Sequence, residues 1–379
     1  MWDPTYIKRM DYRIVAIVTI LMCISLLVIT ATTSPSSLIG GEKIVLSSLV
    51  KNQAKAFLLG WIAYLFLVGF DYRKLREWTW FLYLGIVILL LGLYFTTPIH
   101  NVRRWYRLPF LPFDIQPSEF AKLIVVVALS WFLEKKGELS ARIPTFFMAS
   151  TIVFIPFILI LKQPDLGTAL ILCPMALVIF YFGGIKRQIV RMLSVVALAL
   201  FGFVLMIFLG LFSHEELRPF FTTFMKEYQF ERLNPNTYHQ KAGQTAIALG
   251  QITGTGFCKS EFTGHHWLPY GYTDSVFPAF TEEFGLIGAY LLITLFFGLI
   301  YFSFQVSTVA NDHFGKLLSA GIAVYLAMHV IINMGMMCGL LPITGVPLII
   351  VSYGGSSVMS TMTALGLLQS IYARRFTFS

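Results

Sequence analysis

Ten apolar runs constrain the fold of this chain more than any other feature. A transmembrane helix needs about 20 apolar residues, and most of the runs approach or exceed that length. In lipid, every backbone polar group must be satisfied within its own segment, so each run predicts a helix. We therefore expect an all-α polytopic membrane protein with about ten transmembrane helices. The runs lie near residues 14–34, 54–70, 78–97, 117–134, 144–161, 166–183, 189–212, 277–305, 314–338 and 355–372.

The composition supports a membrane protein and disfavours several other classes. Of the 379 residues, 57% are hydrophobic and 12% are charged, whereas about a quarter of the residues in a soluble domain are charged. The formal net charge of +9 does not indicate nucleic-acid binding, because the basic residues form short clusters between the apolar runs. The four cysteines show no spacing of a metal site or a disulfide framework. We expect no cleaved signal peptide, because the first apolar run is long enough to remain as an anchor.

Lysine and arginine residues gather in alternate loops, and this pattern predicts the topology. Short loops rich in these residues face the cytoplasm, which places both termini inside and the loop after the seventh run outside. The clusters are Lys8, Arg9 and Arg13; Arg73, Lys74 and Arg76; Lys135, Lys136 and Arg142; Lys186, Arg187 and Arg191; Lys316; and Arg374 and Arg375. The outer side also carries Arg103, Arg104 and Arg107, which this rule leaves unexplained.

One loop, residues 213–276, separates the seventh and eighth runs and is far longer than an ordinary connection. Its aromatic residues and the paired His265 and His266 argue against disorder. We expect this large extracytoplasmic loop to lie on the outer leaflet or to pack on the helices, within a single domain of residues 1–379. No internal repeat is visible, which disfavours a secondary transporter.

Asp274 is the strongest candidate for a catalytic group. It lies where the large loop meets the eighth run, and an ionisable side chain at such a boundary is costly and often functional. A helix cap is the alternative, because an anion is favourable at a helix N-terminus in any case. Burial would raise the pKa of Asp274, whereas a nearby Lys122 or a metal ion would lower it. The sequence leaves the direction open.

A second group of polar residues lies between the third run and the start of the fourth. Glu119 and Lys122 are spaced to share one helical face, either as a local ion pair or as the polar wall of a cavity. Arg103 and Arg104 stand beside Trp105, a residue typical of the membrane interface. The two arginines could bind lipid headgroups, or they could bind a diphosphate, for which guanidinium geometry is suited.

Several other signals concern the backbone. Pro117 is well placed to begin a helix, and Asp165, in a tight turn before the sixth run, is either a helix N-cap or a functional carboxylate. Segment 333–357 is rich in Gly and Pro, which break helices and let backbone approach a ligand. A re-entrant packing element is the alternative for this segment. The glycines of 250–256 do not follow a strand, so they do not form a dinucleotide-binding motif.

Together, these motifs resemble the SEDS family of bacterial cell-wall polymerases, and within it the elongation member RodA more than FtsW. The resemblance rests on Gln-Pro-Ser-Glu at 116–119, Gln-Pro-Asp-Leu-Gly-Thr at 163–168 and Ser-Tyr-Gly-Gly-Ser-Ser at 352–357. The match covers most of the chain in order, and the loop 339–347 is similar to the RodA version.

The resemblance implies a peptidoglycan glycosyltransferase that polymerises lipid II into glycan strands for cell elongation and shape, releasing undecaprenyl diphosphate. It implies a place in the bacterial cytoplasmic membrane, an active site facing outside, and contact with membrane lipids. The implied partners are the elongation machinery and a class B penicillin-binding protein transpeptidase. Asp274 would be the essential aspartate. The substrate-binding residues would be Arg103, Arg104, Trp105, Glu119, Lys122, Gln163, Asp165, Gln240, Gln244, Thr273, Asn333, Ser352 and Ser356.

The sequence departs from this family next to Asp274. Members usually carry Glu and His before the Thr-Asp pair, where Tyr270 and Tyr272 stand here, and an aromatic residue where Ser275 stands. A tyrosine can hydrogen-bond a carboxylate but cannot carry positive charge as a histidine can. We therefore expect the tuning of Asp274 to differ from that of its relatives.

One carboxylate is chemically sufficient for this reaction. It can accept the proton of the attacking hydroxyl. Diphosphate is already a good leaving group and needs charge neutralisation, by arginines or by a divalent cation such as Mg²⁺ or Mn²⁺. The alternatives are a lipid II flippase, which is a transporter, and a non-catalytic scaffold for wall enzymes. The clustering of polar residues on the outer side disfavours the flippase.

Overall fold

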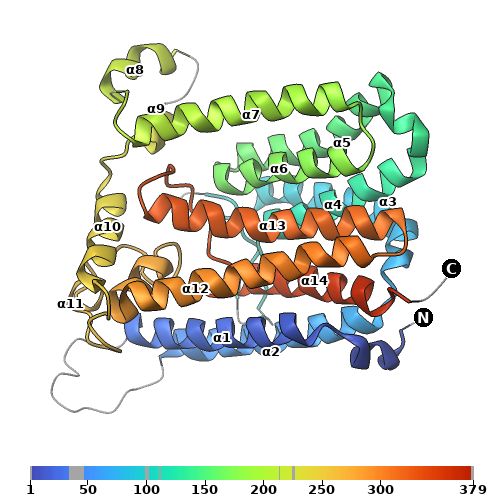
Figure 1. The fold of residues 1–379 in the computed structure, drawn as a ribbon. Helices are drawn as coiled ribbons and strands as arrows, with labels where there is room; N and C mark the ends of the chain where they lie inside the picture. The colour runs from blue at the N-terminus through green and yellow to red at the C-terminus, as the bar shows by residue number, and fades with distance from the viewer. Residues whose placement is uncertain are drawn as a thin grey trace.

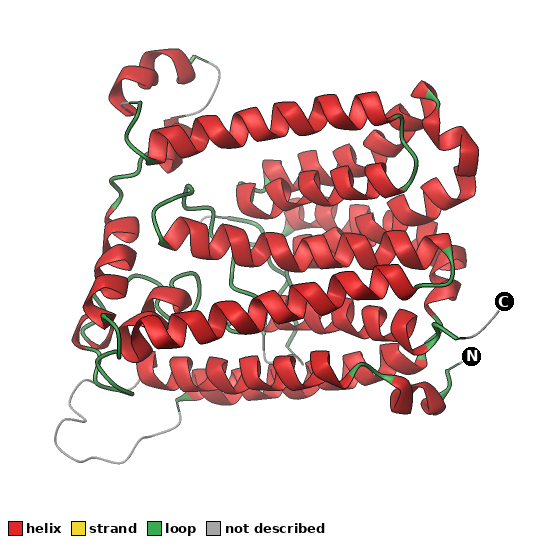
Figure 2. Cartoon of the chain, in the orientation of Figure 1, coloured by secondary structure: helices red, strands yellow, loops and turns green. Residues whose placement is uncertain are grey.

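Ten long helices make up most of the described part of the chain, and they coincide with the ten predicted runs. The computed structural model describes residues 2–33, 47–98, 102–109, 111, 113–212, 214–223 and 227–376. The long helices are α1 (Tyr12–Thr33), α2 (Ser48–Gly69), α3 (Leu75–Gly92), α4 (Pro117–Lys136), α5 (Ile143–Lys162), α6 (Leu166–Phe182), α7 (Arg187–Phe208), α12 (Val276–Val309), α13 (His313–Met337) and α14 (Gly355–Ala373). Helix dominates in Figure 2, where the described chain has no strand. The all-α prediction is confirmed.

Among the described residues, six helical segments are long and apolar enough to cross a membrane by length and composition. Five are α1, α5, α7, α12 and α13, and the sixth is α3 extended to Tyr72–Phe95. Helices α4 and α14 carry polar side chains that are buried inside the protein rather than an uninterrupted apolar sequence. The polytopic membrane fold is therefore supported, while the number of ten spans stays a prediction.

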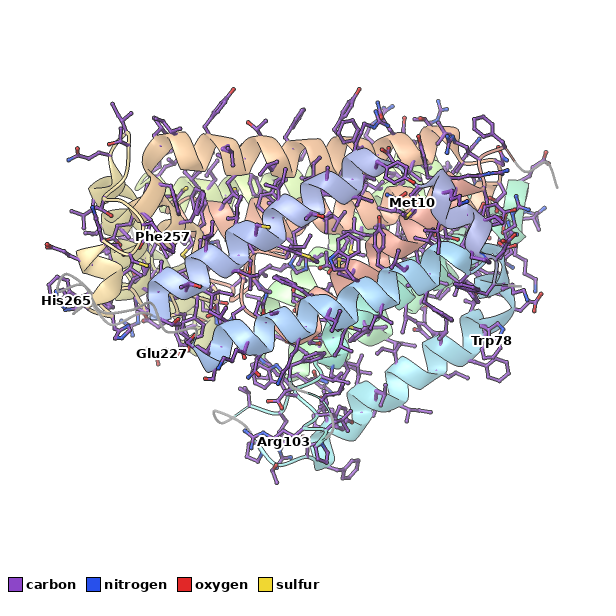
Figure 3. The ribbon with its side chains drawn as sticks, turned by 90° about the horizontal axis from the view of Figure 1, so that it is seen from below. Met10, Trp78, Arg103, Glu227, Phe257 and His265 are labelled. Atoms are coloured by element: carbon purple, nitrogen blue, oxygen red, sulfur yellow. The ribbon has the colours of Figure 1, made fainter. Side chains whose placement is uncertain are left out.

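The two ends of the helix bundle differ (Figure 1). Both chain termini lie at one end, and α10 and α11 lie at the other, beside the start of α12. Figure 3 places Phe257 and His265 at this second end, and Met10 and Trp78 at the first. We call the second end the loop end. The predicted separation of the termini from the large loop is thus seen in the fold.

The helices differ in how far the protein covers them. Helix α14 lies against α2, and nearly all of its residues are buried. Helix α7 lies at the edge of the bundle (Figure 1), and only its Val190 and Ile207 are buried. The apolar side chains that α7 exposes are suited to contact with lipid rather than with water.

Local signals set several boundaries as predicted. Helix α4 begins at Pro117. Asp165 caps α6, because its side chain accepts a hydrogen bond from the backbone N–H of Thr168 at 3.4 Å. The segment between α13 and α14 is irregular, and its residues 348–351 are buried. An irregular backbone of this kind is tolerated where protein surrounds it.

The described part of the region between α7 and α12 contains four short helices, of which α10 and α11 pack on the bundle, against α12 and α1. They are α8 (His214–Phe221), α9 (Glu227–Phe230), α10 (Tyr238–Gly250) and α11 (Glu261–Gly264). Helix α10 packs against α12. Gly254 and Gly285 both have positive φ, and a Cβ added to either would overlap the backbone of the opposite segment. The glycines around 250–256 therefore allow a close approach of backbones.

Candidate active site

The turn that carries Asp274 lies at the loop end. Side chains from other segments hold it by hydrogen bonds to its backbone carbonyls. The Ser352 hydroxyl donates to the carbonyl of Thr273 at 2.7 Å, and the Asn333 amide donates to the carbonyl of Asp274 at 2.9 Å. A Cβ added to Gly345 would lie 3.6 Å from Asp274 Oδ2, so the irregular segment before α14 runs past the carboxylate. Three of the predicted residues thus meet around Asp274.

The Asp274 carboxylate itself accepts no hydrogen bond from the described residues. It is only partly exposed. This burial raises the pKa of Asp274 to about 6, the Arg104 guanidinium opposes the rise, and the Asp165 carboxylate adds to it. The cation that lowers the pKa is therefore Arg104 rather than Lys122.

The rings of the two tyrosines before Asp274 contact other aromatic side chains. The Tyr270 ring is exposed and lies 5.8 Å from the His239 ring, and Tyr272 meets the Tyr353 ring edge-on. Within the described chain, neither tyrosine hydroxyl bonds to the Asp274 carboxylate.

Arg104 is fixed by the turn between α5 and α6. Its guanidinium donates to the carbonyl of Gln163 at 2.9 Å and to the carbonyl of Pro164. Arg103 is exposed and donates to the carbonyl of Tyr94 at 2.6 Å. In Figure 3, Arg103 and Trp78 lie at opposite ends of α3. The pair is therefore divided, with only Arg104 acting on Asp274.

Asp165 joins two helix starts as well as capping α6. Its Oδ2 accepts hydrogen bonds from the Gln116 amide at 2.9 Å and the Ser118 hydroxyl at 3.1 Å. The Ser356 hydroxyl accepts a bond from the backbone N–H of Gln116 at 3.0 Å. The N-cap interpretation and an electrostatic effect on Asp274 both hold for Asp165.

Glu119 and Lys122 form a buried ion pair at 2.9 Å. Lys122 Nζ also lies 2.7 Å from His329 Nε2, and His329 Nδ1 lies 3.1 Å from the carbonyl of Pro347. Because an ammonium group only donates, Nε2 is the acceptor and the imidazole donates from Nδ1. This fixes a neutral tautomer of His329, a residue that sequence reasoning missed although it lies one turn before Asn333.

Three predicted glutamines hold backbone carbonyls with their side-chain amides. The Gln163 amide donates to the carbonyl of Leu90 at 3.0 Å. Gln240 donates to the carbonyls of Met336 and Leu341, each at 3.1 Å. Gln244 bonds the carbonyl of Cys338 at 3.4 Å. The last two therefore fasten α10 to the end of α13.

Two carboxylates that sequence reasoning missed fasten the large loop to α12. Glu282 accepts hydrogen bonds from the backbone N–H groups of Phe262 and Thr263 and from the Thr263 hydroxyl. Glu283 accepts from the Cys258 N–H at 2.8 Å and the Ser260 hydroxyl at 2.7 Å. We call this arrangement the Glu282–Glu283 latch. The adjacent glutamates at the start of an apolar run were the available signal.

Two hollows lie beside Tyr106, and Asp274 lines neither. One, of about 480 Å³, lies between α3 and α4 and is lined by apolar side chains that include Phe81, Ile86 and Phe120. The other, of about 260 Å³, is lined by Trp105 together with Thr96, Thr97, Tyr106 and Arg107. Trp105 therefore faces a hollow that is separate from the carboxylate.

The described residues bring together no group of three or more His, Cys, Asp or Glu side chains that could hold a metal ion. Mg²⁺ is usually bound by one or two carboxylates together with substrate phosphates. Asp165 and Asp274, whose charges act on each other, would be the two carboxylates of such a site.

Comparisons with known proteins extend over nearly the whole chain. The family model of the FtsW, RodA and SpoVE cell cycle proteins matches residues 12–376. The peptidoglycan glycosyltransferase MrdB of Escherichia coli (strain K12) is 30% identical, over 80% of this chain and 80% of its own. The peptidoglycan glycosyltransferase RodA of Treponema pallidum (strain Nichols) is 28% identical, over 90% of this chain and 93% of its own. A solved chain from a peptidoglycan synthase complex that coordinates polymerization and crosslinking superposes with a TM-score of 0.77 at 25% identity, over 97% of this chain and 99% of that chain.

Proposed function

Because this chain belongs to the FtsW, RodA and SpoVE family and is a peptidoglycan glycosyltransferase, we propose that Asp274 is its catalytic base. The observation that carries this proposal is the Asp274 carboxylate, which is half-buried and accepts no hydrogen bond from the described chain. Its pKa of about 6 leaves it mostly ionised at neutral pH and more basic than an ordinary aspartate. A general base works best when its pKa lies near the working pH.

The reaction that fits this base is the polymerisation of lipid II. The acceptor hydroxyl loses its proton to Asp274 while its oxygen forms a bond to the anomeric carbon of the donor. The bond from that carbon to the diphosphate breaks, and undecaprenyl diphosphate leaves with the electron pair. A single displacement of this kind inverts the anomeric centre, and the diphosphate needs no proton from a second carboxylic acid.

Arg104 is the residue best placed to neutralise the leaving diphosphate. Two backbone carbonyls hold its guanidinium, and its charge already acts on Asp274. A fixed cation near developing negative charge stabilises a transition state without rearrangement. A divalent cation, Mg²⁺ or Mn²⁺, would supply the same neutralisation, with Asp165, Asp274 and diphosphate oxygens as its ligands.

The hollow between α3 and α4 suits the lipid part of the substrate. Its lining is apolar, and it lies beside Pro117, which begins the same helix that carries Glu119 and Lys122. We assign it to the polyprenyl chain of lipid II, because burial of apolar surface is favourable in proportion to its area.

The loop end would face the outside of the bacterial cytoplasmic membrane, with both termini in the cytoplasm. The basic clusters support this orientation, since they gather near the start of α1, the end of α4 and the end of α14. The partners would be a class B penicillin-binding protein and the elongation machinery. The similarity to a chain from a peptidoglycan synthase complex, and to proteins named MrdB and RodA, supports these partners.

Replacing Asp274 by Asn tests the proposal, because Asn is nearly isosteric and cannot act as a base. Purified Asp274→Asn protein with its transpeptidase partner should form no glycan from lipid II, while its thermal unfolding and partner binding match wild type. Polymerisation near the wild-type rate would remove Asp274 as the base. Lipid II movement across vesicles in the absence of any polymer would favour the flippase.

A further inference from the structure

The hydroxyl of Ser275 does not play the role that its position predicts. Ser275 precedes the first residue of α12, and serine at that position usually accepts a hydrogen bond from the first turn of the helix. Here Ser275 makes no such cap bond. Its fully buried hydroxyl instead lies 2.7 Å from Nε2 of His239.

His239 belongs to α10, a helix that is anchored to the end of α13. Its neighbour Gln240 is buried and donates to the carbonyls of Met336 and Leu341. Burial lowers the pKa of His239 below its ordinary value, so the ring is neutral at neutral pH. A neutral imidazole on an anchored helix is a suitable fixed partner for a hydroxyl.

The hydrogen bonds around Asp274 come from two sides. Asn333 holds the carbonyl of Asp274, and Ser352 holds that of Thr273, from the side of α13 and the segment that follows it. His239 holds Ser275 from the side of α10. Because the carboxylate accepts no bond from the described chain, its position depends on how firmly these neighbours fix the backbone.

We propose that His239 is a positioning residue that fixes the Asp274 carboxylate for proton transfer, acting through the hydroxyl of Ser275. The proposal rests on the proposed role of Asp274 as the base. A misplaced base slows the chemical step, whereas substrate binding, which other residues supply, is unchanged.

The test compares lipid II polymerisation by four variants of the full chain with its transpeptidase partner. His239→Phe keeps an aromatic ring beside Tyr270 but removes the hydrogen bond to Ser275. Ser275→Ala removes the hydroxyl that takes part in the same bond. Each should lower kcat about tenfold and leave KM unchanged. His239→Gln, which can still reach the hydroxyl, should recover most of the lost kcat. The double variant His239→Phe with Ser275→Ala should be no slower than either single variant, because both remove one interaction.

His313→Phe is the matched control, because His313 is exposed at the start of α13, and it should keep wild-type kcat. Wild-type kcat in both His239→Phe and Ser275→Ala would overturn the proposal, as would losses that add in the double variant or a rise in KM alone. Ser275→Ala keeps the test open if His239→Phe fails to fold, because that serine makes no cap bond. Asp274→Asn, assayed alongside, separates the two claims: its activity would remove the base itself, whatever His239 does.

Discussion

Asp274 and the Glu282–Glu283 latch lie close together in the chain, yet their carboxylates differ in the hydrogen bonds that they accept. Glu282 accepts three hydrogen bonds from Phe262 and Thr263. Glu283 accepts two, from Cys258 and Ser260. Asp274 accepts none from the described chain, although its own backbone carbonyl and that of Thr273 are held by Asn333 and Ser352.

The difference fits a structural role for the latch and the proposed role of Asp274 as a base. A buried charge is tolerated when donors surround it, and the latch uses that requirement to hold the large loop against α12. A base must keep a lone pair free for the substrate proton. The absence of described donors at the Asp274 carboxylate is therefore what the proposed base requires, and burial alone would not distinguish Asp274 from the latch.

The largest effect on folding should come from breaking the latch. Glu282→Ala leaves the donors of Phe262 and Thr263 unpaired, at about 1–3 kcal/mol for each buried group. We expect a lower unfolding temperature and rapid cleavage of residues 255–263 in limited proteolysis. Asp274→Ala leaves no hydrogen-bond donor of the described chain unpaired, so its unfolding temperature should match that of the wild type. Glu261→Ala, at an exposed neighbouring residue, is the control. Equal stability of all three variants would contradict the structural role of the latch.

A smaller effect, on the pKa of Asp274, should follow from Arg104→Gln. The guanidinium favours the ionised carboxylate, so its removal raises the pKa of Asp274 further. Because the base must be ionised, the acid limb of the kcat/KM profile should move to higher pH. Arg103→Gln should not move it, since Arg103 is exposed and bonds the carbonyl of Tyr94. A profile that stays in place in Arg104→Gln would contradict the assigned electrostatic link.

The smallest effect, of opposite sign, should come from Asp165→Asn. The Asp165 carboxylate disfavours ionisation of Asp274 and ranks after Arg104 among the charges that act on it. Its replacement should lower the pKa of Asp274 and move the acid limb to lower pH, by less than Arg104→Gln moves it upward. Asn remains a good N-cap, so α6 should persist. Asp114→Asn serves as the control, because Asp114 pairs with Arg107 instead. A shift to higher pH in Asp165→Asn would be the contrary result.

Much of the fold could be predicted because lipid imposes one rule on every segment. The apolar runs give the ten long helices, and Pro117 and Asp165 give two helix starts. The resemblance singled out Asp274. The charge of Arg104 acts on Asp274, and the catalytic role of Asp274 stays a prediction.

The direction in which each polar side chain faces could not be predicted. The resemblance implies that Gln163 and Gln240 line or shape the cavity, and the structure adds that their amides bond the carbonyls of Leu90 and of the end of α13. His239 pairs with Ser275 across 36 positions, a contact that depends on how α10 packs on α12. No local pattern encodes such a distance, because tertiary packing decides it.

The pH dependence of single-turnover glycan transfer by the wild-type chain with its partner tests the central claim most directly. The diphosphate of lipid II is esterified at both ends and does not titrate in this range, so the enzyme's base sets the profile. With Asp274 as the base, the rate should rise about tenfold per pH unit at low pH and level off above a midpoint near 6. A midpoint near the ordinary aspartate value, or a rate independent of pH across this range, would contradict the account.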